Sequence, residues 1–186
     1  DQRALILRDV ETLQARLREA SLRDALTGLH NRRFYDMTVQ REFARCRRER
    51  LPIGLLVIDA DHFKHVNDSW GHAGGDEVLR ALGALLTQAF RTEDLVCRFG
   101  GEEFVVLMPG AAQSVCVARA EALREAVADL EVRVPAGLIR FTVSIGVAVG
   151  QADTFTPEAL FAAADGAVYE AKEGGRNRVA LAQGMT

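Results

Sequence analysis

The chain has 186 residues, of which 48% are hydrophobic, enough for one domain with a single core and a short extension. Its net charge of −3 excludes a general attraction to nucleic acid or to an anionic membrane, so an anionic ligand needs a local cluster of cations. An odd number of widely spaced cysteines argues against a disulfide framework or a zinc site and favours a reducing cytoplasm: Cys46, Cys97 and Cys116.

The first predicted element is a helix over residues 1–22. Its hydrophobic residues alternate in spacings of four and three, which is typical of the contact row of a coiled coil: Ile6, Val10, Leu13, Leu17 and Ala20. We therefore expect a dimerising stalk at residues 1–22 and one folded domain at residues 23–186. Because the row is shorter than the roughly three to four heptads that establish a coiled coil, a single amphipathic helix packed on its own domain stays an alternative.

The N-terminal residues and the lengths of the hydrophobic runs bear on the cellular location of the protein. The chain begins with Asp1 rather than with methionine, so we expect it to be a fragment of a larger protein. No hydrophobic run approaches the roughly 20 residues of a membrane span, and the N-terminus has no signal-peptide core. We expect a cytoplasmic domain, which a missing N-terminal region could anchor to a membrane.

The remaining elements alternate between helices and strands. We expect helices over residues 32–50, 75–90, 112–130 and 157–172, and strands over residues 53–60, 95–99, 104–108, 138–149 and 178–182. The order β-α-β-β-α-β predicts an α/β (α+β) fold of the ferredoxin-like type, in which helices flank a mostly antiparallel sheet. The basic run of the first of these helices has no aromatic residues to stack bases, which argues against nucleic-acid binding.

The hairpin at residues 98–104, RFGGEEF, is the most informative segment. Gly100 and Gly101 favour a tight turn and let another molecule approach the backbone closely. Glu102 and Glu103 follow as adjacent carboxylates, which repel each other unless a cation, a proton or water relieves them. A purely structural hairpin rarely needs this arrangement.

A second polar segment follows the strand over residues 53–60. It mixes oxygen donors suited to magnesium with a lysine suited to phosphate: Asp59, Asp61, Lys64, Asn67 and Asp68. Taken alone, Asp61 fits better as the cap of a short following helix than as a metal ligand. Phe63 at the fifth position and the missing turn glycine exclude an EF-hand, and three histidines lack the second cluster that a zinc site needs: His62, His65 and His72.

No motif for nucleophilic catalysis or for a common nucleotide loop is present. The chain lacks a Walker A loop, G-x-G-x-x-G and G-x-S-x-G, and no cysteine has an obvious base. Two carboxylate regions that meet around magnesium and a nucleotide are a better interpretation. Near the C-terminus, Lys172 and Arg176 either complement the dipole of a helix ended by Gly174 or Gly175, or bind phosphate.

Five separated motifs together resemble the GGDEF domain of diguanylate cyclases, in its GGEEF form. They are DALTGLHNRR at 24–33, VIDADHFKHVNDSWGHAGGDEVL at 57–79, RFGGEEF at 98–104, TVSIGVA at 142–148 and AKEGGRNRV at 171–179. The resemblance implies a fold similar to adenylyl cyclases and polymerase palms. It also implies conversion of two GTP into cyclic di-GMP and two pyrophosphates by a homodimer, with the stalk relaying signals from an upstream sensory domain.

The resemblance also implies the residues of the site. Two Mg²⁺ per GTP, with Mn²⁺ as a possible substitute, would be held by Asp59, the backbone carbonyl of Ala60, and Glu103. Glu102 matches the residue that assists the metals or takes the proton of the attacking 3'-hydroxyl. The phosphates would meet the backbone of His62 and Phe63 and the cations of three further residues: Lys64, Lys172 and Arg176.

Base selection and product inhibition have their own matching residues. Asn67 and Asp76 match the guanine-binding pair, and a carboxylate accepts two hydrogen bonds from guanine N1 and N2 where adenine offers none, so we expect GTP rather than ATP. The segment RTED at 91–94 matches an inhibitory RxxD motif, with Arg91 and Asp94 binding cyclic di-GMP and Arg45 as a secondary contact. The alternative is a cyclic di-GMP receptor or scaffold without turnover, which would not need the intact carboxylates.

Overall fold

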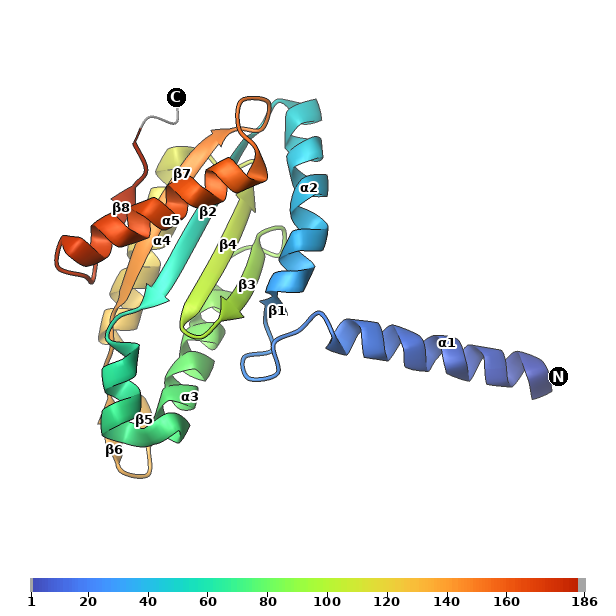
Figure 1. Ribbon diagram of the computed structural model, residues 1–186, viewed down its shortest axis with the longest axis horizontal. Helices are drawn as coiled ribbons and strands as arrows, with labels where there is room; N and C mark the ends of the chain where they lie inside the picture. Colours follow the sequence, from blue (N-terminus) through green and yellow to red (C-terminus); the bar gives the residue numbers. More distant parts are fainter. Residues whose placement is uncertain (1, 184–186) are drawn as a thin grey trace.

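The computed structural model describes residues 2–183. Within that range the helices are α1 (Gln2–Ala20), α2 (Arg32–Glu49), α3 (Phe63–Ala89), α4 (Gln113–Asp129) and α5 (Pro157–Glu173). The strands are β1 (His30–Asn31), β2 (Pro52–Ala60), β3 (Leu95–Gly100), β4 (Glu103–Pro109), β5 (Val132–Val134), β6 (Gly137–Ile139), β7 (Val143–Gln151) and β8 (Val179–Leu181). Figure 1 shows α1 projecting away from the α/β domain that the other elements form.

The main sheet has the strand order β1-β3-β4-β2-β7-β8. Strands β3, β4, β2 and β7 pair antiparallel, while β1 and β8 add parallel partners at the two edges. The four central strands are those of the predicted β-α-β-β-α-β unit, which confirms the ferredoxin-like, palm-like plan.

Strand β2 is buried on both faces because its hydrophobic run is nearly continuous. Leu56 and Ile58 point to one side, into a core built with α3 and α4, whereas Leu55 and Val57 point to the other side, toward α2 and α5. Each face of the sheet therefore carries a helical layer (Figure 1). The carboxyl end of β2, where the polar segment begins, lies between these layers.

A glycine in β7 sets how closely α5 approaches the sheet. A Cβ atom at Gly146 would lie 2.1 Å from the backbone oxygen of Ala164 and 2.5 Å from the backbone nitrogen of Val168. Only a residue without a side chain permits this contact between helix and strand. The close packing places the C-terminal end of α5, which carries Lys172, near the end of β2.

Two predicted elements differ from the structure. The strand expected over residues 138–149 is two strands, because β6 folds back onto β5 through a turn that ends at Gly137, whose φ is 146°. Residues 140–142 then interrupt the extended run before β7. The helix expected over residues 75–90 belongs to α3, which starts at Phe63 and is broken at Gly71, with φ 73° and ψ 171°.

Helix α1 leaves its hydrophobic row open to solvent. The side chains of residues 3–20 are all exposed, and Ile6, Val10, Leu13 and Leu17 are between 46% and 62% exposed. The alternative of an amphipathic helix packed on its own domain does not match this arrangement. Across residues 2–183, no helix is both long and apolar enough to cross a membrane.

Candidate active site

The two carboxylate regions meet at the ends of adjacent strands. Asp59, near the end of β2, lies directly opposite Glu103, the first residue of β4. The backbone N–H of Ala60 donates to the backbone oxygen of Glu102 at 3.2 Å, which extends the pairing into the hairpin turn. The structure thus brings together the acids predicted from two distant segments.

A lysine from α5 completes this cluster. Lys172 Nζ lies 3.0 Å from Asp59 Oδ2, so the cation predicted near the C-terminus faces the strand-end carboxylate. Burial raises the pKa of Asp59 above its ordinary value, Lys172 partly offsets this effect, and the charges of Glu102 and Asp61 raise the pKa further. Lys172 therefore does more than complement the dipole at the end of α5, because it also pairs with the strand-end carboxylate.

Glu103 lies in an environment that is unfavourable to its charge. Burial raises its pKa, the negative charges of Asp165 and Asp59 raise it further, and Lys172 and Arg32 only partly counter them. A buried and a half-buried carboxylate that share one lysine have an excess of negative charge, which a divalent cation would relieve. The oxygen donors thus fit a hard metal ion such as Mg²⁺.

The side chains alone do not make a complete metal cage. In the described part of the chain, no group of three or more His, Cys, Asp or Glu side chains is arranged to hold a metal ion. In this structure Lys172 occupies the Asp59 carboxylate that the family pattern assigns to metal. A backbone carbonyl, such as that of Ala60, and the nucleotide itself would have to supply the remaining ligands.

The glycine turn is held by an arginine that sequence reasoning missed. Gly100 and Gly101 have φ values of 131° and 52°. Arg98 Nη2 donates to the backbone oxygen of Gly101 at 2.8 Å, and Arg98 Nη1 lies 3.0 Å from Asp24 Oδ1. Asp24 also accepts hydrogen bonds from the N–H and the hydroxyl of Thr27. Asp24 and Arg98 each begin one of the five motifs quoted above, and this position in the sequence could have pointed to them.

The predicted guanine-binding residues lie on the two halves of α3. Gly71 breaks the helix between Asn67 and Asp76, so the halves fold against each other. A Cβ atom at Gly75 would lie 1.9 Å from Asn67 Oδ1, which shows that Asn67 packs directly on the backbone next to Asp76. The pair is therefore brought together, and both side chains remain partly exposed to a ligand.

The residues predicted at the phosphates lie in two short segments. His62 has a left-handed φ of 54° and precedes Phe63 and Lys64 at the start of α3. Arg176, with φ 64°, follows the end of α5, where the N–H of Gly175 donates to the backbone oxygen of Lys172 at 3.2 Å. The glycines therefore end the helix, as one interpretation proposed, while Arg176 follows at its end and Lys172 faces Asp59.

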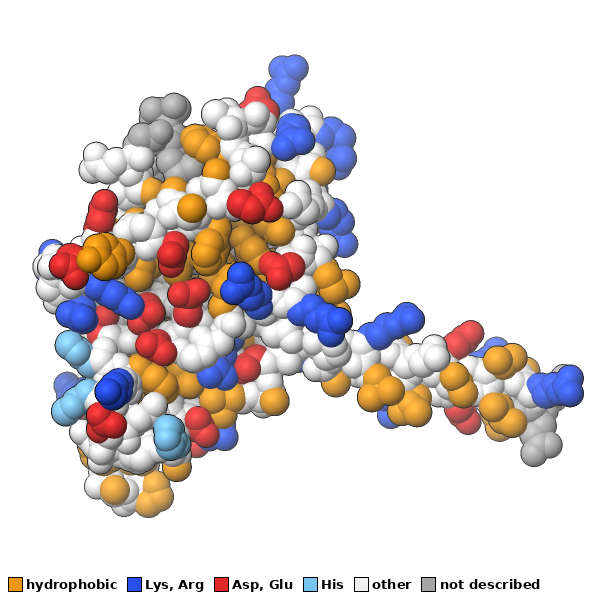
Figure 2. Space-filling view, viewed as in Figure 1, with side chains coloured by type: hydrophobic (Ala, Val, Ile, Leu, Met, Phe, Trp, Pro, Cys, Tyr) orange, Lys and Arg blue, Asp and Glu red, His pale blue; other side chains and the backbone are white. Residues whose placement is uncertain are grey.

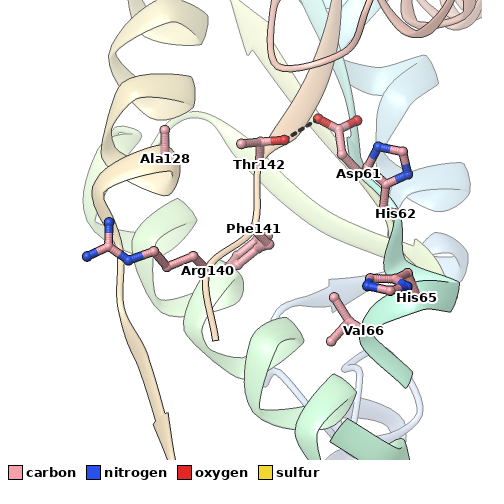
Figure 3. A pocket seen from close by; sticks show the side chains of 8 residues that line it. All are labelled: Asp61, His62, His65, Val66, Ala128, Arg140, Phe141 and Thr142. Atoms are coloured by element: carbon pink, nitrogen blue, oxygen red, sulfur yellow. Dashed lines mark hydrogen bonds between the residues drawn. The ribbon is translucent and has the colours of Figure 1, made fainter. Parts of the chain in front are cut away.

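The prediction that Asp61 caps the short helix is wrong. His62 is the N-cap residue and makes no side-chain capping bond. The carboxylate of Asp61 instead turns toward β7, where it accepts hydrogen bonds from the hydroxyls of Thr142 and Ser144. Figure 3 shows Asp61 and Thr142 in the wall of a cavity of about 520 Å³. Neither Asp59 nor Glu103 lines this cavity, so it is distinct from the carboxylate pair.

The predicted inhibitory motif forms a closed turn. Arg91 Nη2 lies 3.2 Å from Asp94 Oδ1, and the backbone N–H of Arg91 donates to Asp94 Oδ2 at 3.0 Å. The Asp94 side chain is 1% exposed and that of Arg91 47%. Two cavities of about 380 and 340 Å³ share Asp94 in their walls, and Arg45 lines the second. All three predicted product-binding residues therefore line two neighbouring surface cavities that share Asp94.

His30 also lines both of these cavities, and no sequence pattern singled it out. Its ring stacks on Phe34 at a centroid distance of 3.7 Å. Within residues 2–183, its Nδ1 is buried without a hydrogen-bond partner. Burial lowers its pKa, and the charge of Arg23 lowers it further, which favours a neutral ring.

Comparison with known proteins decides the family. The model of the diguanylate cyclase GGDEF domain matches residues 21–178, a span that begins directly after α1. The chain belongs to the GGDEF domain family. The carboxylate pair, the glycine turn and the broken helix α3 described above all lie inside the matched span of this GGDEF domain.

Individual relatives support the assignment. The diguanylate cyclase DgcM of Escherichia coli K12 is 45% identical over 175 residues, which cover 91% of the chain and 40% of DgcM. The GGDEF domain thus spans less than half the length of this curated relative. The crystal structure of the coiled coil and GGDEF domain of DgcB from Caulobacter crescentus, in complex with cyclic di-GMP, superposes with a TM-score of 0.90 at 33% identity, covering 98% of this chain and 96% of that one.

The GGEEF sequence of the hairpin also occurs in a similar protein of known structure. The active GGEEF domain of a diguanylate cyclase from Vibrio cholerae is 30% identical, with a TM-score of 0.77, covering 83% of this chain and 97% of that one. A glutamate at the third position is thus found in a domain described as active.

Proposed function

We propose that this GGDEF domain is a diguanylate cyclase, which condenses two GTP molecules into cyclic di-GMP and releases two pyrophosphates. The observation that carries the proposal is the pairing of Asp59 with Glu103 beside Lys172, at the ends of two adjacent strands. The 45% identity to a diguanylate cyclase supports it. The intact carboxylates weigh against a receptor or scaffold without turnover, because binding of cyclic di-GMP alone has no need of them.

The reaction consists of two nucleotidyl transfers. Each 3'-hydroxyl oxygen attacks the α-phosphorus of the opposite GTP, forms a P–O bond and displaces pyrophosphate, and the hydroxyl proton leaves to a base or to water. Glu102 stands next to Glu103 in the turn and is our candidate for that base or for an additional metal contact. The backbone of Gly100 and Gly101 would lie against the nucleotide. A Cβ atom built at either glycine would meet no atom of the described chain within 4 Å, apart from the glycine and its two neighbours, so the space beside this backbone is open.

Two magnesium ions per GTP are part of the proposal, with manganese as a possible substitute. When bound, they would lower the pKa of the hydroxyl and neutralise charge on the phosphates. Asp59, Glu103 and the carbonyl of Ala60 would hold them. We expect Lys172 to leave Asp59 for a phosphate oxygen when GTP binds, because one lysine cannot satisfy both anions.

GTP contacts away from the metals follow the same logic. The guanine edge would bind Asn67 and Asp76, and the phosphates would meet the backbone of His62 and Phe63. Three cations would bind the phosphate oxygens: Lys64, Lys172 and Arg176. Lys64 lies in the first turn of α3, which follows β2, while Lys172 and Arg176 lie at the end of α5, where Lys172 contacts Asp59 of β2.

A second copy of the chain is required, because each domain would bind one GTP and the product contains two. We propose that residues 1–22 form the dimerising stalk, that residues 23–186 form the catalytic domain, and that a sensory domain lies upstream in the full protein. The exposed hydrophobic row of α1 supports this role. Three free, buried cysteines fit a reducing compartment such as the cytoplasm.

The decisive experiment is incubation of the chain with GTP and Mg²⁺, followed by chromatography for cyclic di-GMP and pyrophosphate. We expect product from the wild-type chain, none after chelation of the metal, and a loss of at least about 100-fold in Glu103→Gln, which keeps the shape and removes the charge. A chain that binds cyclic di-GMP but forms none from GTP would instead be a receptor.

Product inhibition is proposed at the RTED turn. Cyclic di-GMP would bind Arg91 and Asp94 across the two cavities, with Arg45 as a secondary contact. Since Asp94 already accepts two hydrogen bonds from Arg91, the ligand would have to reorganise this pair. Titration of the product against the wild type and Arg91→Ala tests the site, and equal inhibition of both would remove it.

A further inference from the structure

Asp61 accepts three hydrogen bonds through its buried carboxylate, although it stands only two residues from Asp59. The residue is 4% exposed. Its Oδ2 accepts from the Thr142 hydroxyl at 2.7 Å and from the backbone N–H of Asn177 at 3.0 Å, and its Oδ1 accepts from the Ser144 hydroxyl at 2.6 Å. A carboxylate has about four lone-pair directions, so little capacity remains for another ligand.

The three donors come from two other parts of the fold. Thr142 and Ser144 lie at the start of β7, whereas Asn177 lies in the loop between α5 and β8, next to Arg176. Asp61 itself belongs to the segment that leaves β2, and its N–H donates to the backbone oxygen of Thr142 at 2.9 Å. One buried side chain thus joins the ends of β2 and β7 to the loop that follows α5.

That loop has a backbone conformation that needs external support. Arg176 and Asn177 are consecutive non-glycine residues with φ values of 64° and 45°. Side chains other than glycine disfavour this left-handed region, so the surrounding structure must hold it. The hydrogen bond from the Asn177 N–H to Asp61 contributes to that hold, together with a bond from Arg124 Nη1 to Asn177 Oδ1 at 3.2 Å. The Arg176 N–H also donates to the backbone oxygen of Ala171 at 3.0 Å, which ties the start of the loop to α5.

We propose that Asp61 is a positioning residue, which binds neither metal nor substrate and fixes Arg176 in place relative to Asp59. The inference rests on the proposed function, because the role of Arg176 is to contact the phosphates of GTP. Asp59 and Asp61 thus divide the tasks of the segment that ends β2. One faces the reaction, and the other holds the loop that carries a phosphate-binding cation.

Two substitutions separate this role from that of a metal ligand. In Asp61→Asn the amide oxygen can take the place of Oδ2 and accept from Thr142 and Asn177, while the amide nitrogen donates to the Ser144 hydroxyl, which can also accept. The contacts survive and the charge is lost. In Asp61→Ala all three contacts are lost, and the N–H of Asn177 is left without its acceptor.

The primary measurement is the affinity of the full chain for 3'-deoxy-GTP with Mg²⁺ by calorimetry, because this analogue lacks the attacking hydroxyl and cannot react. We expect Asp61→Asn to stay within about threefold of the wild type and Asp61→Ala to bind roughly tenfold or more weakly, the effect of one lost charge-assisted contact. In turnover, the Asp61→Ala effect should fall mainly on KM. Equal losses in Asn and Ala variants would overturn the proposal and indicate a metal ligand.

A double substitution tests whether Asp61 acts through Arg176. Arg176→Ala should weaken binding in the wild-type chain but add little in the Asp61→Ala chain, since the arginine is already misplaced there. If the two substitutions weaken binding independently, so that their fold-losses multiply in the double variant, the proposal is overturned. This outcome stays decisive even if Asp61→Ala lowers stability, provided that binding is measured below the thermal transition of that variant. A wild-type chain that binds no 3'-deoxy-GTP would overturn the proposed function as well, which distinguishes the two failures.

Discussion

At the scale of single residues, the acidic side chains near the site have different tasks because they have different neighbours. Asp24 bonds to Arg98, Asp59 to Lys172 and Asp94 to Arg91. In Asp24 the hydrogen bonds from Thr27 and Arg98 outweigh the effect of burial and lower the pKa, whereas in Asp59 burial prevails and raises it. A carboxylate whose charge is well compensated holds the structure together, and one whose charge is poorly compensated is suited to a cation.

Asp76 is predicted to select the base. Replacement by Ser removes the double acceptor for guanine N1 and N2, so we expect Asp76→Ser to raise KM for GTP and to reduce a preference over ATP that such a site can make about 10⁴-fold. Competition between GTP and ATP in the cyclase assay measures this ratio. Asp153→Ser, an exposed change beyond the far end of β7, is the matched control. An unchanged ratio in Asp76→Ser would refute the assignment.

His30 predicts a pH dependence of stability. Its pKa in the folded chain is lowered from the ordinary 6.5, so the unfolded chain takes up the proton more readily. The contribution of a neutral His30 is therefore complete above pH 6.5 and is lost as the pH falls from there toward the lowered pKa.

Urea denaturation at several pH values between 5 and 8 measures this dependence. We expect the free energy of unfolding of the wild type to fall more steeply on acidification than that of His30→Phe, which can keep the stacking on Phe34. Identical slopes in the two proteins would show that His30 does not carry the effect.

At the scale of elements, the break in α3 brings the two residues proposed to bind guanine, Asn67 and Asp76, close together. Gly71 allows the helix to turn back, and two successive glycines let the halves touch: a Cβ at Gly74 would lie 2.5 Å from Trp70 Cβ, and one at Gly75 would lie 1.9 Å from Asn67 Oδ1. Helix propensity alone disfavours glycines in such a position. Their presence is explained by close packing of the two halves rather than by the stability of either half.

Gly75→Ala should therefore damage binding more than folding. The added methyl group must displace Asn67, and we expect KM for GTP to rise roughly tenfold, as for a lost hydrogen bond to the base. Gly166→Ala is the control, because Gly166 lies in α5 with open space around it, and alanine there should raise stability by about 0.5–1 kcal/mol. Calorimetric melting and GTP kinetics measure both variants. Unchanged KM in Gly75→Ala would contradict the role of the glycine.

At the scale of the whole molecule, helix α1 projects from the α/β domain (Figure 1), but hydrogen bonds link the segment that follows it to the glycine turn. Helix α1 projects from the domain, and Figure 2 shows hydrophobic side chains exposed along it. The chain that leaves α1 reaches Asp24 within four residues of Ala20, and Asp24 binds Arg98, which holds the Gly101 carbonyl. Helix α1 thus ends close to a contact that supports the glycine turn of the candidate site.

The stalk is predicted to set the concentration dependence of activity. Leu13→Glu places a charge in the hydrophobic row, so we expect the specific activity at low protein concentration to fall roughly tenfold or more and to recover as concentration rises, by mass action. Leu13 is 59% exposed in the single chain, so the substitution should leave the folding of the chain unaffected. Ala15→Glu, which adds the same charge outside the row, is the control. Equal activity profiles for both variants would exclude a dimerising stalk.

Much of this architecture is encoded locally. The spacing of hydrophobic residues predicted the main helices and strands, because burial of one face imposes a period of 3.6 or 2 residues. The strand over residues 138–149 failed this rule, although Ile139 and Phe141 are both buried. A turn before Gly137 pairs β6 with β5, and residues 140–142 break the extended run before β7. Five short motifs were sufficient to indicate the family, and two of them contain the carboxylates of the candidate site.

The tertiary structure decided which acid does what. Asp59 and Asp61 are equally acidic in the sequence, yet one meets Lys172 and the other meets Thr142, Ser144 and the N–H of Asn177, which is 116 residues away. Arg98 and Asp24, 74 residues apart, likewise meet only in the folded chain. The charge and hydrogen bonding of a buried carboxylate depend on partners from distant segments, and periodicity and spacing along the chain carry no information about them.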